Sequence, residues 1–320
     1  MLLRSSIATA FTLSLALLLL AAPAVPQEEG MATFRSDTRL VVLHASVVDK
    51  KGNLITDLRQ DAFTVYENDK PQQVTLFRRE DVPVSLGLVV DNSGSMRDKR
   101  QKVESAAVTF VEESNPQDEI FVVNFNDEAY LDVDFTNNIR KMEEGLTRID
   151  SRGGTAMRDA LSMCIDHLVE KAEKDKKVLL VVTDGNDNTS GTTIEELVHK
   201  AQQTEVLLYS VGLLNEEQKR ERKRAKRALN ALTTASGGLS YYPEQLSEVE
   251  QIAIKVAHEI RNQYVIGYSP SSPELDGTYR RIRVDVKARG RPSVRTRSGY
   301  YASPVAPSNR SLTDTTSSTE

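Results

Sequence analysis

The feature that most constrains the fold of this chain is an alternation, between residues 84 and 261, of short apolar runs with longer amphipathic segments. Runs such as Val178-Leu-Leu-Val-Val182 contain almost no polar residue, which is typical of parallel strands buried on both faces. The segments between them have helical periodicity. We therefore predict an α/β fold, with a doubly wound, mostly parallel sheet covered by helices on both faces.

The apolar runs and the periodic segments between them give the expected elements of this region. Strands are expected at residues 84–90, 119–125, 130–135, 177–183, 205–211 and 239–242. Helices are expected at residues 97–114, 155–173, 193–203, 217–235 and 246–261.

Both flanks of this region show the two-residue period of antiparallel strands. Residues 36–80 contain the alternating run Phe63-Thr-Val-Tyr-Glu67, and residues 263–301 contain Ile282-Arg-Val-Asp-Val286. Neither flank is large enough to form a stable sandwich alone. We expect the two flanks to pair into one small antiparallel β-sandwich, into which a domain of residues 82–262 is inserted.

The two ends of the chain have compositions unlike the rest. Residues 1–26 combine Arg4, an apolar stretch from Ile7 to Ala22, and small residues with prolines, which predicts a secretory signal peptide. We expect a secreted or periplasmic protein of the cell envelope, without stable membrane insertion after cleavage. A retained membrane anchor is the alternative, although the stretch is short for a span. Residues 302–320 are rich in Ser and Thr, and we expect them to be disordered.

Composition argues against several classes of function and partner. The net charge of -5 gives no reason to expect nucleic acid as a partner. The basic run of residues 219–227 is interpreted as a solvated helix end, with binding to an acidic surface polymer as the alternative. Cys164 is the single cysteine, so no internal disulfide can form, and its helical spacing with Leu161, Ile165 and Leu168 predicts a buried core thiol.

The strand expected at 84–90 ends in a cluster of oxygen-bearing side chains. Asp91, Ser93 and Ser95 occupy alternate positions of Asp91-Asn-Ser-Gly-Ser95, and oxygen ligands suit a hard cation such as Mg²⁺. The carboxyl ends of strands are also where open α/β sheets bind ligands. The same residue types form ordinary turns, so this run alone leaves both interpretations open.

Two later loops carry the same chemistry. Thr155 lies in Arg152-Gly-Gly-Thr-Ala156, just before an expected helix, and Asp184 ends the strand expected at 177–183. Oxygen-bearing residues on separate loops of one sheet favour a cation site over turn formation alone. Asp187 and Asn188 follow closely, as either turn residues or a second cation site.

Together, over residues 82–262, these positions resemble the von Willebrand factor type A domain and its metal-ion-dependent adhesion site (MIDAS). The family pattern is Asp-x-Ser-x-Ser, then a distant Thr and a distant Asp, on a Rossmann-like sheet. The resemblance implies that Ser93 and Ser95 bind the ion directly, and Thr155 directly or through water. It implies that Asp91 and Asp184 act mostly through water or hydrogen bonds.

That resemblance also implies the cofactor and the kind of partner. The ion would be Mg²⁺, with Mn²⁺ or Ca²⁺ as alternatives, and an open ligand position would accept an Asp or Glu of a partner protein. Over most of the mature chain, including Gln263-Tyr-Val-Ile-Gly-Tyr-Ser-Pro270, the sequence is similar to exported bacterial proteins named for a von Willebrand type A related domain in acidobacteria.

The expected function is therefore that of an exported, metal-dependent protein-binding and adhesion module rather than an enzyme. The sequence has no Gly-x-Ser-x-Gly elbow, no Gly-x-x-x-x-Gly-Lys-Ser/Thr loop and no His-x-x-x-His pattern. A scaffold subunit of an envelope complex, with the metal site occupied or vestigial, is the alternative. A metal-dependent hydrolase is the third possibility. The sequence sets neither the partner nor the oligomeric state.

Overall fold

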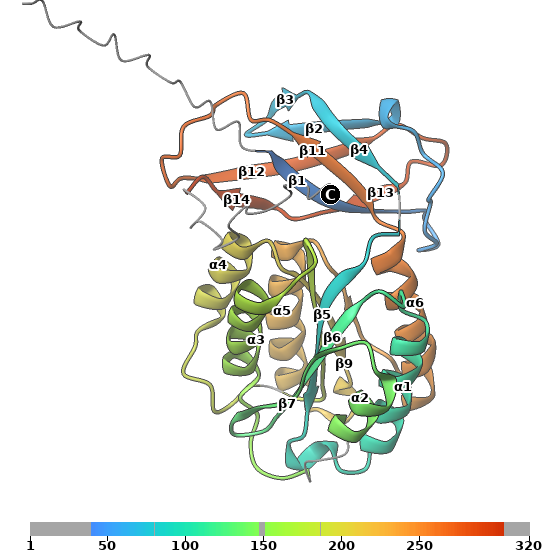
Figure 1. The fold of residues 1–320 in the computed structure, drawn as a ribbon. Helices are drawn as coiled ribbons and strands as arrows, with labels where there is room; N and C mark the ends of the chain where they lie inside the picture. Colours follow the sequence, from blue (N-terminus) through green and yellow to red (C-terminus); the bar gives the residue numbers. More distant parts are fainter. Residues whose placement is uncertain (1–39, 80, 147–150, 186, 304–320) are drawn as a thin grey trace, which may run out of the picture. The chain divides into compact units, whose positions relative to one another are not determined.

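The computed structural model describes residues 40–79, 81–146, 151–185 and 187–303, which form three β-sheets and the helices that cover one of them (Figure 1). The expected signal peptide of residues 1–26 and the chain beyond residue 303 lie outside the described residues. Within the described ranges, no helix has both the length and the apolar composition to cross a membrane.

The largest sheet is six-stranded, and its order is β10-β9-β8-β5-β6-β7. All neighbours are parallel except β7, which runs antiparallel to β6. Its strands are β5 (Val84–Asp91), β6 (Glu119–Phe125), β7 (Ala129–Thr136), β8 (Lys176–Thr183), β9 (Leu207–Gly212) and β10 (Ser240–Tyr241). The prediction of an α/β fold with a mostly parallel sheet is confirmed.

Helices cover both faces of this sheet because its strands are apolar on both sides (Figure 1). One core contains Leu180 and the apolar faces of α1 (Arg100–Glu112), α2 (Ile139–Leu146) and α6 (Val249–Arg261). The other contains Leu179 and packs α3 (Met157–Lys171), α4 (Ile194–Thr204) and α5 (Lys219–Ser236). Cys164 is a free, fully buried thiol in this second core, as expected.

Helix α2 was not expected from the sequence. It has only eight residues, fewer than the window over which a helical period is read from a sequence, although its buried residues Met142 and Leu146 share one face. Helix α1 begins at Arg100 rather than at residue 97, because residues Gly94–Met96 form a 3₁₀ turn (η2). That turn belongs to the candidate site.

The remaining sheets are four-stranded, and each combines strands from both ends of the described chain. Their orders are β13-β1-β11-β4 and β14-β12-β2-β3. The first sheet contains β1 (Val41–Val48), β4 (Val74–Arg78), β11 (Tyr264–Tyr268) and β13 (Ser293–Arg295). The second contains β2 (Phe63–Glu67), β3 (Lys70–Gln72), β12 (Tyr279–Val286) and β14 (Gly299–Tyr301). Antiparallel pairing sets Leu43 opposite Ile266 and Val65 opposite Val284, and all four belong to one shared core.

Candidate metal-binding site

Asp91 and Asp184 lie at the same edge of the parallel sheet. Asp91 is the last residue of β5, Asp184 directly follows β8, and the two strands are parallel neighbours. Both aspartates are buried, with 0% and 2% of their surface exposed. A buried carboxylate is costly unless it is hydrogen-bonded or paired with a cation, so the contacts of these two residues decide what this edge can bind.

The turn after β5 brings two hydroxyl groups together. The backbone N–H of Ser93 donates to Asp91 Oδ1 at 2.8 Å, and residues Gly94–Met96 then form η2. As a result Ser93 Oγ and Ser95 Oγ are 3.2 Å apart. Neighbouring ligands of an octahedral Mg²⁺ ion, each about 2.1 Å from the metal, are about 3.0 Å apart. The two hydroxyl groups therefore have the spacing of two ligands of one small cation, and Ser95 is exposed to solvent.

Hydrogen bonds connect both aspartates to this turn. Ser95 Oγ donates to Asp184 Oδ1 at 2.8 Å, and Thr183 Oγ1 donates to Asp91 Oδ2 at 2.6 Å. Burial raises the pKa of Asp91 to about 6, and the charge of Asp184 acts in the same direction, while hydrogen bonds from Thr183 and Ser93 oppose the shift. Both Asp91 oxygens accept hydrogen bonds. This suits a carboxylate that would contact a bound ion through water or a hydrogen bond rather than directly.

The loop before α3 lies against the turn and contains Thr155. The Gly94 N–H donates to the Gly153 carbonyl at 3.2 Å, and the Thr155 N–H donates to Asn188 Oδ1 at 2.9 Å. Gly153 has a φ of 77°, and a Cβ there would lie 2.1 Å from Asp127 Oδ2. Thr155 itself is buried, with 5% of its surface exposed. The three predicted loops therefore lie together at the carboxyl ends of β5 and β8.

Asp187 and Asn188, which the sequence left as turn residues or a second cation site, have structural partners. The Asp187 carboxylate pairs with the Arg158 guanidinium at 3.0 Å and accepts the Ser190 hydroxyl at 2.7 Å. Asn188 holds the Thr155 backbone. Both residues therefore shape the loops around the site.

Sequence reasoning missed three residues that contact or surround this site. Lys99 Nζ lies 2.6 Å from Asp184 Oδ2, and Thr183 holds Asp91. Glu217 lies near Asp184: its pKa is raised by burial, by the hydrogen bond and charge of Glu221, and by the charge of Asp184. The only sequence signal for Lys99 is its position one helical turn after Ser95, and neighbouring basic residues dilute that signal.

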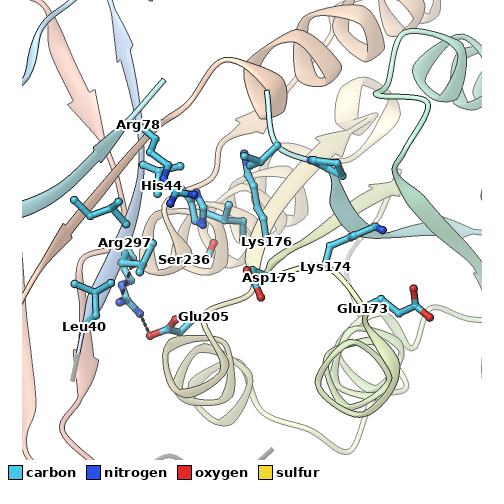
Figure 2. A pocket seen from close by; sticks show the side chains of 16 residues that line it. Leu40, His44, Arg78, Glu173, Lys174, Asp175, Lys176, Glu205, Ser236 and Arg297 are labelled. Atoms are coloured by element: carbon cyan, nitrogen blue, oxygen red, sulfur yellow. Dashed lines mark hydrogen bonds and ion pairs between the residues drawn. The ribbon is translucent and has the colours of Figure 1, made fainter. Parts of the chain in front are cut away.

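Clusters of three or more His, Cys, Asp or Glu side chains suited to a metal are absent from the described ranges. A cavity of about 820 Å³ lies beside the starts of β8 and β9 (Figure 2). Its other wall is the face of the β13-β1-β11-β4 sheet that points away from the core shared by the two antiparallel sheets. Figure 2 shows His44, Lys176 and Arg297 around it, with Arg297 paired to Glu205 at 2.9 Å. Because β8 starts here and ends at the Asp184 edge, this cavity and the candidate site lie at opposite ends of the strands.

Comparisons with known proteins agree with this architecture. A sequence model of the von Willebrand factor type A domain matches residues 86–264. Inter-alpha-trypsin inhibitor heavy chain H4 of Bos taurus is 28% identical over an alignment of 148 residues, and the match covers 41% of this chain. The match spans only 16% of that relative's length.

Two solved structures are similar in fold. A von Willebrand factor type A structure from Catenulispora acidiphila has a TM-score of 0.49 and 12% identity, and the match covers 82% of this chain and 73% of that one. Proximal thread matrix protein 1 from the mussel byssus, solved with a zinc-occupied MIDAS motif, has a TM-score of 0.49 and 15% identity, with 61% and 49% covered. With more than half of its length matched by the family's sequence model, the chain belongs to the von Willebrand factor type A domain family.

Proposed function

We propose that Asp91, Ser93, Ser95, Thr155 and Asp184 hold a divalent cation, and that the bound ion captures an Asp or Glu side chain of a partner protein. The observation that carries this proposal is the 3.2 Å separation of Ser93 Oγ and Ser95 Oγ, in a turn that is hydrogen-bonded to the buried carboxylates of Asp91 and Asp184. Domains of this family commonly mediate protein–protein interactions, which supports a binding function. Mg²⁺ is the expected ion, with Mn²⁺ or Ca²⁺ as alternatives.

The residue types explain why such an ion would attract an anion. Ser93, Ser95 and Thr155 are neutral ligands, and both oxygens of Asp91 already accept hydrogen bonds. An ion held mainly by hydroxyl groups and water keeps more of its positive charge than one surrounded by direct carboxylates. The N-terminus of α3 follows Thr155 by two residues and adds a favourable dipole for an anion.

We also propose an exported location and a domain arrangement for this function. The composition of residues 1–26 supports export, and millimolar divalent ions outside the cytoplasm would fill the site. Residues 82–262 would form the metal-binding domain, inserted into a sandwich of residues 36–80 and 263–301. The pairing of β1 with β11 and of β2 with β12 supports the same arrangement.

Mg²⁺ titration with thermal melting of the full chain tests the metal site. At a hundredfold excess of Mg²⁺ over Kd, the wild type should gain about 2.7 kcal/mol of stability. Ser95→Ala should lose most of this gain, whereas Ser247→Ala, which changes an exposed serine before α6, should keep it. Equal gains in Ser95→Ala and wild type would refute the site, and no gain in the wild type would favour the scaffold alternative.

A pull-down from the native envelope tests the capture of a partner. Binding in Mg²⁺ should disappear in EDTA and in Ser95→Ala, because both remove the ion from the partner's carboxylate. Partner binding that persists in excess EDTA contradicts the mechanism and favours an interaction through the antiparallel sheets.

A further inference from the structure

We propose that Lys99 tunes the candidate metal site: it weakens the binding of the divalent cation and strengthens the capture of a carboxylate by the ion once bound. This inference rests on the proposed function and assigns a role to a residue outside the five expected ligands. Its physical basis is a fixed ammonium group beside one of the two site carboxylates.

The contacts of Lys99 place its charge in the site. Lys99 Nζ is 2.6 Å from Asp184 Oδ2 and 3.3 Å from the carbonyl oxygen of Ser95. The two paired side chains are 7% and 1% exposed, so water screens this charge far less than it screens a surface lysine. The backbone N–H of Lys99 donates to the Met96 carbonyl at 2.9 Å, which ties the residue to η2. The ammonium is therefore held in place by the same turn that presents Ser93 and Ser95.

The charges of the site give the sign of the effect. Asp91 and Asp184 contribute two negative charges and Lys99 contributes one positive charge, so these groups sum to one negative charge without an ion. A divalent cation changes that sum to one positive charge, which attracts a carboxylate. Without Lys99 the corresponding sums are two negative charges and zero.

A purely structural lysine would behave differently. If Lys99 only kept Asp184 in position, its removal would weaken the binding of metal and of carboxylate together. A tuning role instead predicts changes of opposite sign, because a cation is repelled by the ammonium and an anion is attracted by it. The two affinities, measured on one variant, separate these roles.

Mn²⁺ and acetate are suitable probes for the full chain. Electron paramagnetic resonance of free Mn²⁺ gives the metal Kd, and water-proton relaxation of the loaded protein follows displacement of bound water by acetate, with chloride added to keep ionic strength constant. We expect Lys99→Met to bind Mn²⁺ at least about tenfold more tightly and acetate about tenfold more weakly, in line with the effect of one close charge. Lys102→Met, at an exposed position of α1, should change neither value.

A second variant and the wild type keep the outcomes distinct. Lys99→Gln retains a donor toward the Ser95 carbonyl without a charge, and it should shift both affinities in the same directions if Lys99→Met fails to fold. Tighter Mn²⁺ binding in only the variants supports the role of Lys99 even where the wild type binds no ion. Wild-type binding without tighter binding in the variants overturns the role of Lys99 alone. Absence of Mn²⁺ binding in all of them overturns this inference together with the proposed function.

Discussion

At the scale of single residues, the hydrogen bond from Thr183 to Asp91 stabilises a fully buried carboxylate at the end of β5. The Thr183 hydroxyl lies 2.6 Å from Asp91 Oδ2. Thr183→Val keeps the shape of the side chain but leaves that oxygen without its donor. We expect the free energy of unfolding to fall by about 1.5 to 3 kcal/mol, as for a lost hydrogen bond to a charged group. Urea denaturation measures this loss, and Thr189→Val, at an exposed threonine, should show little of it.

The five expected ligands are easier to recognise in the sequence than the residues around them. Asp91, Ser93 and Ser95 are recognisable because their alternate spacing follows directly from one turn. Thr183 and Lys99 are not, since their roles depend on which strand lies beside β5 and on where α1 begins. A threonine that ends a strand carries no local signal of its role, and the spacing of Lys99 after Ser95 is obscured by the basic residues around it.

The loop of residues 151–156 acts at the scale of structural elements, because it places Thr155 against the turn after β5. Gly153→Ala forces a side chain into the left-handed region and toward Asp127 Oδ2. We expect this variant to lose about 1 to 2 kcal/mol of stability and to bind Mg²⁺ more weakly, as measured by calorimetry. Gly191→Ala is the matched control, since a Cβ there has open space and no unusual φ. Unchanged Mg²⁺ affinity in Gly153→Ala would exclude this loop from the site.

Elements with long periodic patterns were predicted well, and so was the short strand β10, but helix α2 and the η2 turn were not. The strands of the parallel sheet follow from continuous apolar runs that leave little choice of structure. Helix α2 and the η2 turn escaped prediction, because eight and three residues are shorter than the window over which a helical period is read. The start of α1 shifted for the same reason.

At the scale of the whole molecule, Glu259 links the parallel-sheet region to the β13-β1-β11-β4 sheet. Its carboxylate, 1% exposed, accepts Arg295 of β13 at 2.7 Å, Ser46 of β1 at 3.0 Å and the Tyr241 hydroxyl at 3.0 Å. Glu259→Ala leaves the buried Ser46 and the half-buried Arg295 and Tyr241 without this acceptor, and we expect it to cost about 1 to 3 kcal/mol of stability in a denaturation experiment. Glu250→Ala, at an exposed position of the same helix, should cost under about 0.5 kcal/mol.

Lys176 lies at the same junction (Figure 2), and we expect it to make stability depend on pH. Burial lowers the pKa of this lysine to about 7, although Asp118, Asp81 and Glu259 oppose the shift. The unfolded chain, with a lysine pKa of about 10.4, binds more protons than the native state between these values. This contribution to stability is therefore present above about pH 10 and lost as pH falls through about 7.

Comparing the wild type with Lys176→Met at several pH values tests this assignment. The wild type should gain stability from pH 7 to pH 10, by at most about 1.4 kcal/mol per pH unit, relative to the variant. Parallel pH profiles for the two proteins would show that Lys176 is not the responsible group.

The general arrangement was accessible from sequence, and the details of the junction were not. Period alone predicted helices on both faces of a parallel sheet with antiparallel strands on either side. Glu259 contacts Ser46, which is 213 positions away in the chain, and Arg295, which is 36 positions away. No local sequence pattern encodes such pairs. They become visible only when β1 and β13 are placed beside α6.

Locating a bound ion tests the central claim most directly. We would crystallise the full chain with Mn²⁺ and measure anomalous scattering at a wavelength where manganese contributes strongly. The account predicts a single strong peak about 2 Å from both Ser93 Oγ and Ser95 Oγ, beside Asp91 and Asp184. A map with no peak between these two hydroxyl groups, at saturating Mn²⁺, would contradict it.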